Sequence, residues 1–234
     1  MGCDIHMYAE RYNREDRKWE KVGNEFISNY GIYSVTKHIE NEVGCDTKIA
    51  ENILNKYIDN SYDKNFNPKN IQEKLEKYIF NYLNENLPPK DKEVYWLESE
   101  LEDKLPNIYT CTPYDGRNYD LFGVLAGVRS NEFNTIDYPR GLPEDVTEEI
   151  KNKHQEWDLD AHSATYYSLD ELLDSKYRKM SVGELVELRL GYFFKDVLDT
   201  CLKLTDNPSD FRLVFWFLKK KCIFVKHLIF NKTI

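Results

Sequence analysis

The sequence lacks the signature motifs of the best-marked hydrolase and zinc-enzyme classes. Gly-x-Ser-x-Gly, His-Glu-x-x-His and paired Cys-x-x-Cys are all absent. The five cysteines, at positions 3, 45, 111, 201 and 222, have neither the spacing of a zinc site nor the pattern of a disulfide framework. We therefore expect reduced thiols and a cytoplasmic location.

The sequence also has no long apolar run, no positive net charge and few arginines. No apolar run is long enough to cross a bilayer. The start Met1-Gly2-Cys3 resembles a dual-acylation signal, but His6 stands where that signal has serine or threonine. The formal net charge of −9 on 234 residues disfavours a protein that coats nucleic acid or an anionic membrane. We expect neither a membrane anchor nor a nucleic-acid polymer as partner.

Two segments predict the central strands of a sheet. Residues 3–11 alternate between apolar and polar, residues 13–16 are typical of a turn, and residues 19–22 can return as the second strand of a hairpin. Residues 211–218 are apolar on both faces apart from Arg212, as expected of a buried central strand. The N-terminal hairpin and this C-terminal strand are expected to share one mostly antiparallel sheet.

Helical signals separate these strands. Helices are expected over residues 121–128 and from Pro143 to about residue 156, where proline suits the first helical position. Ser168–Glu171 and Ser181–Glu184 match the capping box, and the second opens what we expect to be the longest helix. The sequence therefore predicts an α+β fold, a sheet covered by helices.

Residues 40–108 differ in composition from the rest. They are rich in Asn, Lys, Glu, Tyr and Ile with helical spacing, and they carry no concentrated chemistry. We interpret them as a helical insertion or lid in a core domain made of residues 1–39 and 109–234; a plain surface helix pair is the alternative. The basic, apolar tail after Lys219 is either a disordered extension or an added strand.

The most distinctive pattern lies in the first strand. Strand alternation places one polar row on a single face: Asp4, His6, Tyr8 and Glu10. The opposite face is apolar: Cys3, Ile5, Met7 and Ala9. A second Asp-x-His occurs at Asp160–His162. We predict that the two Asp-x-His pairs converge on one pocket.

Such a pair of motifs suits a metal site, an acid–base pair or a ligand clamp. Asp4, His6, Asp160 and His162 together could hold a divalent metal such as Mn, Fe or Zn. Alternatively His6 and His162 could act as an acid–base pair, each oriented by its aspartate. The plainer interpretation is that these groups hydrogen-bond across the sheet. The remaining histidines are expected to be surface or packing residues: His38, His154 and His227.

Arginines and tyrosines gather in the region of unusual turns after residue 109. Arginine's planar fork suits phosphate, and tyrosine rings stack on bases. Together with Tyr8, the predicted ligand-binding residues of this region are Tyr114, Asp115, Arg117, Asn118, Tyr119, Arg129, Arg140 and Ser163. The set favours a nucleotide-like ligand. In the plainer alternative the arginines pair with acidic residues and the tyrosines fill half-buried positions.

Four motifs carry a resemblance. They are the opening Met-Gly-Cys-Asp-Ile-His, Tyr-Asp-Gly-Arg-Asn-Tyr-Asp-Leu-Phe at 114–122, Pro-Arg-Gly-Leu-Pro at 139–143 and His-Ser at 162–163. As a set they resemble a family of uncharacterised phage and prophage proteins. The resemblance implies a protein that works in the cytoplasm of a bacterial host cell, where phage proteins neutralise nucleotide second messengers of host defence.

Three functions are consistent with these observations. The leading hypothesis is a counter-defence protein that sequesters a nucleotide-derived small molecule in an Asp/His/Arg/Tyr-lined site. The second is a phosphodiesterase that uses the two Asp-x-His pairs. The third is an inhibitor that binds a host defence enzyme through its acidic surface and the helical insertion. A homo-oligomer is compatible with each.

Overall fold

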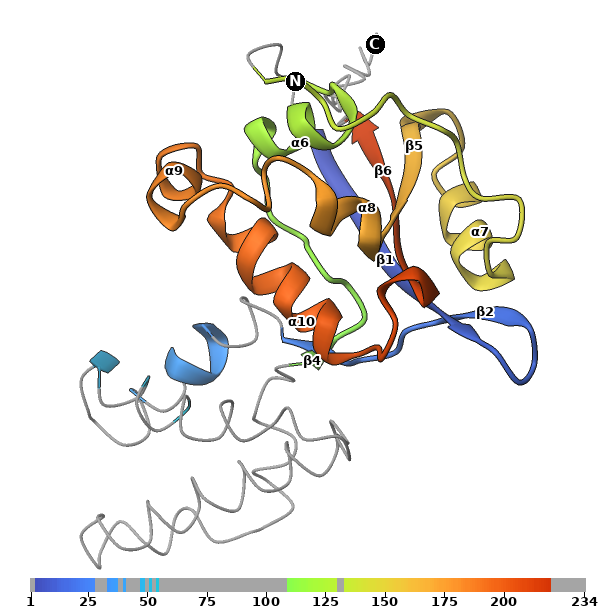
Figure 1. Ribbon diagram of the computed structural model, residues 1–234, viewed down its shortest axis with the longest axis horizontal. Coiled ribbons are helices and arrows are strands. Elements are labelled where there is room, and N and C mark those ends of the chain that lie inside the picture. The colour runs from blue at the N-terminus through green and yellow to red at the C-terminus, as the bar shows by residue number, and fades with distance from the viewer. Residues whose placement is uncertain are drawn as a thin grey trace, which may run out of the picture.

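The computed structural model contains a four-stranded antiparallel sheet with helices on both faces (Figure 1). The structure describes residues 3–27, 33–37, 109–129 and 133–219, and single positions 40, 47, 48, 51 and 54. The five single positions are helical, and the rest of residues 40–108 lies outside the described residues. The insertion, the domain division and the tail after Lys219 therefore stay predictions. Among the described helices, none has both the length and the apolar character that a membrane span requires.

The sheet confirms the predicted α+β class. Its strand order is β2 (Lys18–Lys21), β1 (Cys3–Asn13), β6 (Phe211–Lys219) and β5 (Ala161–Ser168). The predicted hairpin is β1–β2, and the C-terminal strand β6 is central, as its two apolar faces require. A second, two-stranded sheet pairs β3 (Phe26–Ile27) with β4 (Tyr109–Thr110).

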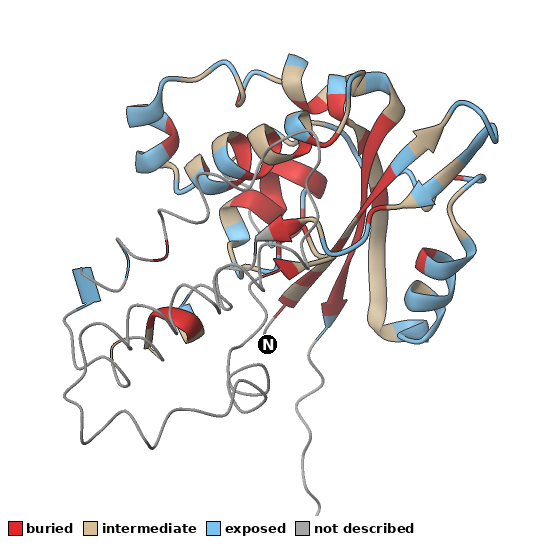
Figure 2. Cartoon of the chain, turned by 90° about the horizontal axis from the view of Figure 1, so that it is seen from below, coloured by how far each residue is buried: buried red, intermediate tan, exposed pale blue. Residues whose placement is uncertain are grey.

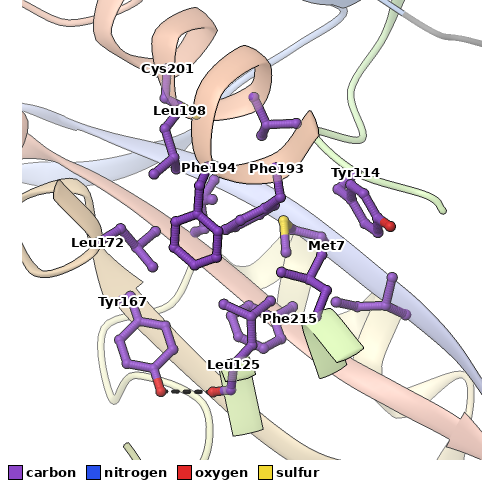
Figure 3. Close-up of a cluster of buried hydrophobic side chains, with 14 of the residues drawn as sticks. Met7, Tyr114, Leu125, Tyr167, Leu172, Phe193, Phe194, Leu198, Cys201 and Phe215 are labelled. Atoms are coloured by element: carbon purple, nitrogen blue, oxygen red, sulfur yellow. Dashed lines mark hydrogen bonds between the residues drawn. The ribbon is translucent and has the colours of Figure 1, made fainter. Parts of the chain in front are cut away.

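One face of the sheet, here called the core face, carries the main hydrophobic core. The apolar row of β1 packs there, as predicted, beside Phe215 and Phe217 of β6. The face is covered by α6 (Tyr119–Ala126), α8 (Leu169–Asp174), the π-helical turn η2 (Tyr192–Val197) and α10 (Leu198–Lys203). The hydroxyl of Tyr167 donates to the Leu125 carbonyl at 2.8 Å and ties β5 to α6 (Figure 3). Figure 2 shows buried residues gathered along the central strands and these helices.

The opposite face, here called the α7 face, is covered by α7 (Glu148–Gln155) (Figure 1). A smaller apolar cluster forms there from Ile150 of α7 and Val214, Trp216 and Leu218 of β6. The polar row of β1 faces this side, because Asp4, His6 and Tyr8 are the cross-strand partners of these three β6 residues. The two faces of the sheet therefore differ. The core face is apolar and fully packed, whereas the α7 face carries both apolar and polar side chains.

The capping predictions are confirmed. The side chains of Ser168 and Ser181 each accept a hydrogen bond from the backbone N–H three residues later. The side chains of Glu171 and Glu184 in turn accept from the backbone N–H of the capping serine. The Asn118 side chain caps α6 by accepting hydrogen bonds from the backbone N–H groups of Asp120 and Leu121.

The prediction of one long helix from Ser181 is wrong. After α9 (Val182–Glu187) the chain turns through Arg189, whose φ of +55° is left-handed. The N–H of Leu190 returns to the Leu185 carbonyl at 2.8 Å, the pattern that ends a helix in a Schellman motif. The turn buries both leucines in the core. Because the left-handed residue is arginine and not glycine, the sequence pattern contains no stop signal.

The helix predicted to begin at Pro143 begins five residues later, and a buried ion pair explains why. Glu10 and Arg212, cross-strand partners on the α7 face, are 0% and 5% exposed, with Nε and Oε2 2.6 Å apart. Arg212 also donates to Asp145 at 2.7 Å, and Glu10 accepts from the Thr147 N–H at 2.7 Å. These bonds hold the backbone before α7 in a non-helical path.

Replacing Arg212 by methionine should strongly destabilise the protein. The apolar stem is kept, but Glu10 is left as a buried carboxylate without its cation, which costs about 3–5 kcal/mol. Urea unfolding followed by circular dichroism measures the loss. Arg14→Met is the matched control, because Arg14 pairs with Asp210 on an exposed surface and should change stability little. Equal effects of the two substitutions would contradict this role.

Candidate functional site

The two Asp-x-His pairs do not share a pocket, so that prediction is wrong. His6 pairs across the sheet with Trp216, and His162 pairs with Phe217. Neighbouring residues of one strand point to opposite faces, so His6 lies on the α7 face and His162 on the core face. Asp160 ends a 3-10 turn before β5 begins and so is not a strand partner of His162.

His162 is held by its own surroundings on the core face. Its ring centroid is 6.1 Å from that of Phe217, and its Nδ1 is 3.1 Å from the Ser163 hydroxyl. Ser163 has a φ of +53° in the irregular pairing between His162 and Thr165. Burial, with the nearby cations Lys219 and Arg129, lowers the pKa of His162.

The predicted metal site is not formed. No group of three or more His, Cys, Asp or Glu side chains in the described part of the chain is arranged to hold a metal ion. Asp4 instead accepts a hydrogen bond from Nε of Arg117 at 2.7 Å and a second hydrogen bond from the same guanidinium. This ion pair closes the N-terminal end of the polar row.

Most of the other predicted ligand residues serve the fold. Tyr114 is buried in the core, and burial raises its pKa to about 12. Asn118 caps α6 and also donates to the Arg189 carbonyl at 2.6 Å. Arg140 pairs with Asp137 and Glu171.

The last three are on the surface. Asp115, Tyr119 and Arg129 are exposed. Arg129 lies near the Cys3 thiol and His162, on the core side of the sheet. Among the described contacts, none joins these three residues to His6.

The side chains that do gather around His6 form an aromatic group, here called the His6 cluster. Its members come from β1, β6, α7 and the turn after α7: His6, Tyr8, His154, Trp157 and Trp216. The His6 ring centroid lies 5.0 Å from Trp157 and 5.9 Å from Trp216, nearly parallel to the latter. Tyr8 stacks on Trp216 at 5.4 Å, and His154 meets Trp216 edge-on at 5.0 Å. Trp216 is thus the common neighbour of three rings.

One polar atom of the cluster is buried without a partner. Among the described residues, the indole N–H of Trp216 makes no hydrogen bond, and its side chain has no exposed surface. Burial lowers the pKa of both histidines, and for His6 the Asp4 carboxylate opposes this shift. An unpaired buried donor costs roughly 1–3 kcal/mol.

The cluster is reachable from solvent and is bordered by cations. Trp157 is 40% exposed, and His6 and Tyr8 are half-buried. Lys21 lies 5.7 Å from the Tyr8 ring, and Lys153 is near enough to act on the Tyr8 phenol. Each ammonium also has a glutamate partner. The surface therefore offers flat rings beside lysine–glutamate ion pairs.

The sequence prediction included only His6 and Tyr8 of this cluster. His154 was expected to be a surface or packing residue, and the two tryptophans were not considered as site residues. The one available signal is that His154 and Trp157 are three residues apart at the end of a helix, which places them on one side of it. Nothing local indicates which strand that side contacts.

Comparison with known proteins gives no assignment. No protein-family model, curated protein or solved structure matches the chain significantly. The function must be inferred from the site itself.

Both histidines of the cluster should titrate below pH 6.5, the usual value. Because the unfolded chain then binds more protons than the folded one, the free energy of unfolding should fall as the pH drops below about 6.5. NMR titration of the imidazole Cε1–H signals, assigned with His6→Gln and His154→Gln, measures the two pKa values. A His6 pKa at or above 6.5 would mean that Asp4 outweighs burial.

Proposed function

We propose that this protein binds and sequesters a nucleotide-derived small molecule at the His6 cluster. The observation that carries the proposal is the aromatic surface at His6, where the Trp157 ring is 40% exposed and lies 5.0 Å from the His6 ring. A nucleobase is flat and carries ring nitrogens and carbonyl oxygens that accept hydrogen bonds. It would stack on Trp157 and place these atoms beside the half-buried His6 imidazole.

The exposed ring and the nearby charges support the same class of ligand. Stacking of a base on an aromatic side chain contributes about 1–3 kcal/mol, and Trp157, at 40%, is the most exposed ring of the cluster. Lys21 and Lys153 at one end, and Arg117 at the other, are each paired with a carboxylate and could exchange that partner for a phosphate.

The motif resemblance narrows the biological setting of this proposal. A phage or prophage protein in the cytoplasm of a bacterial host would meet nucleotide second messengers of host defence, and sequestering one would be a counter-defence activity. The inhibitor hypothesis stays a prediction, because the helical insertion on which it depends lies almost entirely outside the described residues.

Replacing Trp157 by alanine should weaken nucleotide binding by about ten-fold or more, since a stacked base loses its ring. Calorimetry with cyclic mononucleotides, cyclic dinucleotides and ADP-ribose derivatives measures the affinity, and quenching of tryptophan fluorescence reports contact with the cluster. The matched control is Tyr119→Ala. Tyr119 is 37% exposed against 40% for Trp157, but it lies on α6, on the other side of the sheet.

Two results would count against the proposal. The first is that no compound of the panel raises the unfolding temperature of the wild-type protein, since a ligand of the folded state must stabilise it. The second is that Tyr119→Ala abolishes binding while Trp157→Ala leaves it unchanged, which would place the ligand on the core side.

A further inference from the structure

The exposed ring of the His6 cluster lies in a strongly acidic part of the chain. Residues 144–160, which form α7 and the turns on either side of it, hold seven acidic residues and two lysines, more than half of the net charge of −9. Trp157 stands between Glu156 and Asp158, and all three are exposed. A nucleotide that stacks here brings its phosphate into negative surroundings, so a positive charge on its base would favour binding.

The charge of this turn is only partly balanced within the protein. Four of the seven acidic residues form ion pairs with described residues: Asp145, Glu148, Glu149 and Glu156. Asp158 forms no ion pair in the part of the chain that the structure describes. Its φ of +42° is left-handed, a conformation that aspartate and asparagine adopt more readily than most residues. A carboxylate without a cation therefore follows Trp157 directly in the chain.

The Trp157 ring also has no cation over it among the described residues. Elsewhere the protein supplies such a cation itself, since the guanidinium carbon of Arg212 lies 3.9 Å from the centroid of the Trp19 ring. The ring that neighbours Trp157 is instead the imidazole of His6, 5.0 Å away. The face of an indole attracts cations more strongly than any other aromatic side chain does. Trp157 thus offers a cation–π contact that the described part of the protein does not use.

We infer that the nucleotide bound at the His6 cluster carries a positively charged flat ring, such as an N-alkylated pyridinium, which stacks on Trp157 beside Asp158. The inference rests on the proposed binding function and names the class of ligand within it. A cation–π contact raises affinity by about 2- to 5-fold at an exposed site and by about 30-fold where the pair is desolvated. The part of the attraction that comes from Asp158 should weaken with ionic strength, because salt screens surface charges.

The two redox forms of nicotinamide mononucleotide test the charge of the ring. They share the ribose and the phosphate, but the nicotinamide ring is a cation in the oxidised form and neutral in the reduced form. Calorimetry at about pH 7.5, where burial keeps both histidines of the cluster neutral by lowering their pKa values, measures the two affinities. The oxidised form should bind about 3-fold or more tightly. Raising NaCl from about 0.05 M to about 0.5 M should narrow the difference.

Asp158→Asn tests the contribution of the carboxylate. It removes the charge and keeps a side chain of similar shape that tolerates the left-handed backbone. The ratio of the two affinities should fall by about 2-fold or more, the size expected for an exposed charge pair. Asp206→Asn is the matched control, because Asp206 is also exposed and follows α10, which covers the core face. It should leave the ratio unchanged.

The possible outcomes separate this inference from the binding function. Equal binding of the two forms, or tighter binding of the reduced form, would overturn the inference and leave sequestration of an uncharged base standing. So would failure of both forms to bind while another nucleotide of the panel binds. A preference for the oxidised form that Asp158→Asn leaves unchanged would also overturn the assignment. If no nucleotide binds at all, the proposed function itself is removed.

Discussion

The buried Glu10–Arg212 ion pair joins the parts of the protein on which the α7 face depends. It links the two central strands, and through Asp145 and the Thr147 N–H it fixes the chain just before α7. The guanidinium carbon also lies 3.9 Å from the Trp19 ring of β2. Because the start of α7 is anchored in this way, the last turn of the helix and the residues after it are carried to the other end of the polar row.

We place the proposed binding site on the α7 face because its polar and aromatic groups are less completely packed than those of the core face. On the core face, buried polar groups such as the Tyr167 hydroxyl have partners. On the α7 face, the Trp216 indole and the Thr147 hydroxyl are buried without a partner among the described residues. Folding alone does not favour such atoms. The same face presents the exposed Trp157 ring beside His6.

Local sequence predicts the parts of this fold that depend on neighbouring residues. Alternation in residues 3–11 identifies the two faces of β1, the apolar run 211–218 identifies the central strand, and capping boxes locate two helix starts. Local sequence fails where tertiary contacts decide. Arg189 adopts a left-handed turn because two leucines reach the core, and α7 starts late because the ion-pair network uses the preceding backbone.

The candidate site shows the same limit most clearly. Which residues lie beside His6 depends on the register in which β5 pairs with β6, because a shift of one residue changes the face. Alternation correctly places His6 on a polar face, but which partner shares that face depends on how β5 and β6 are aligned. The pairing of His162 with Phe217, one residue from the partner of His6, sends the second imidazole to the far side. A helix packed across the sheet supplies His154 in its place. Of the two imidazoles that meet Trp216, only His6 belongs to one of the two motifs, and no strand motif indicates His154.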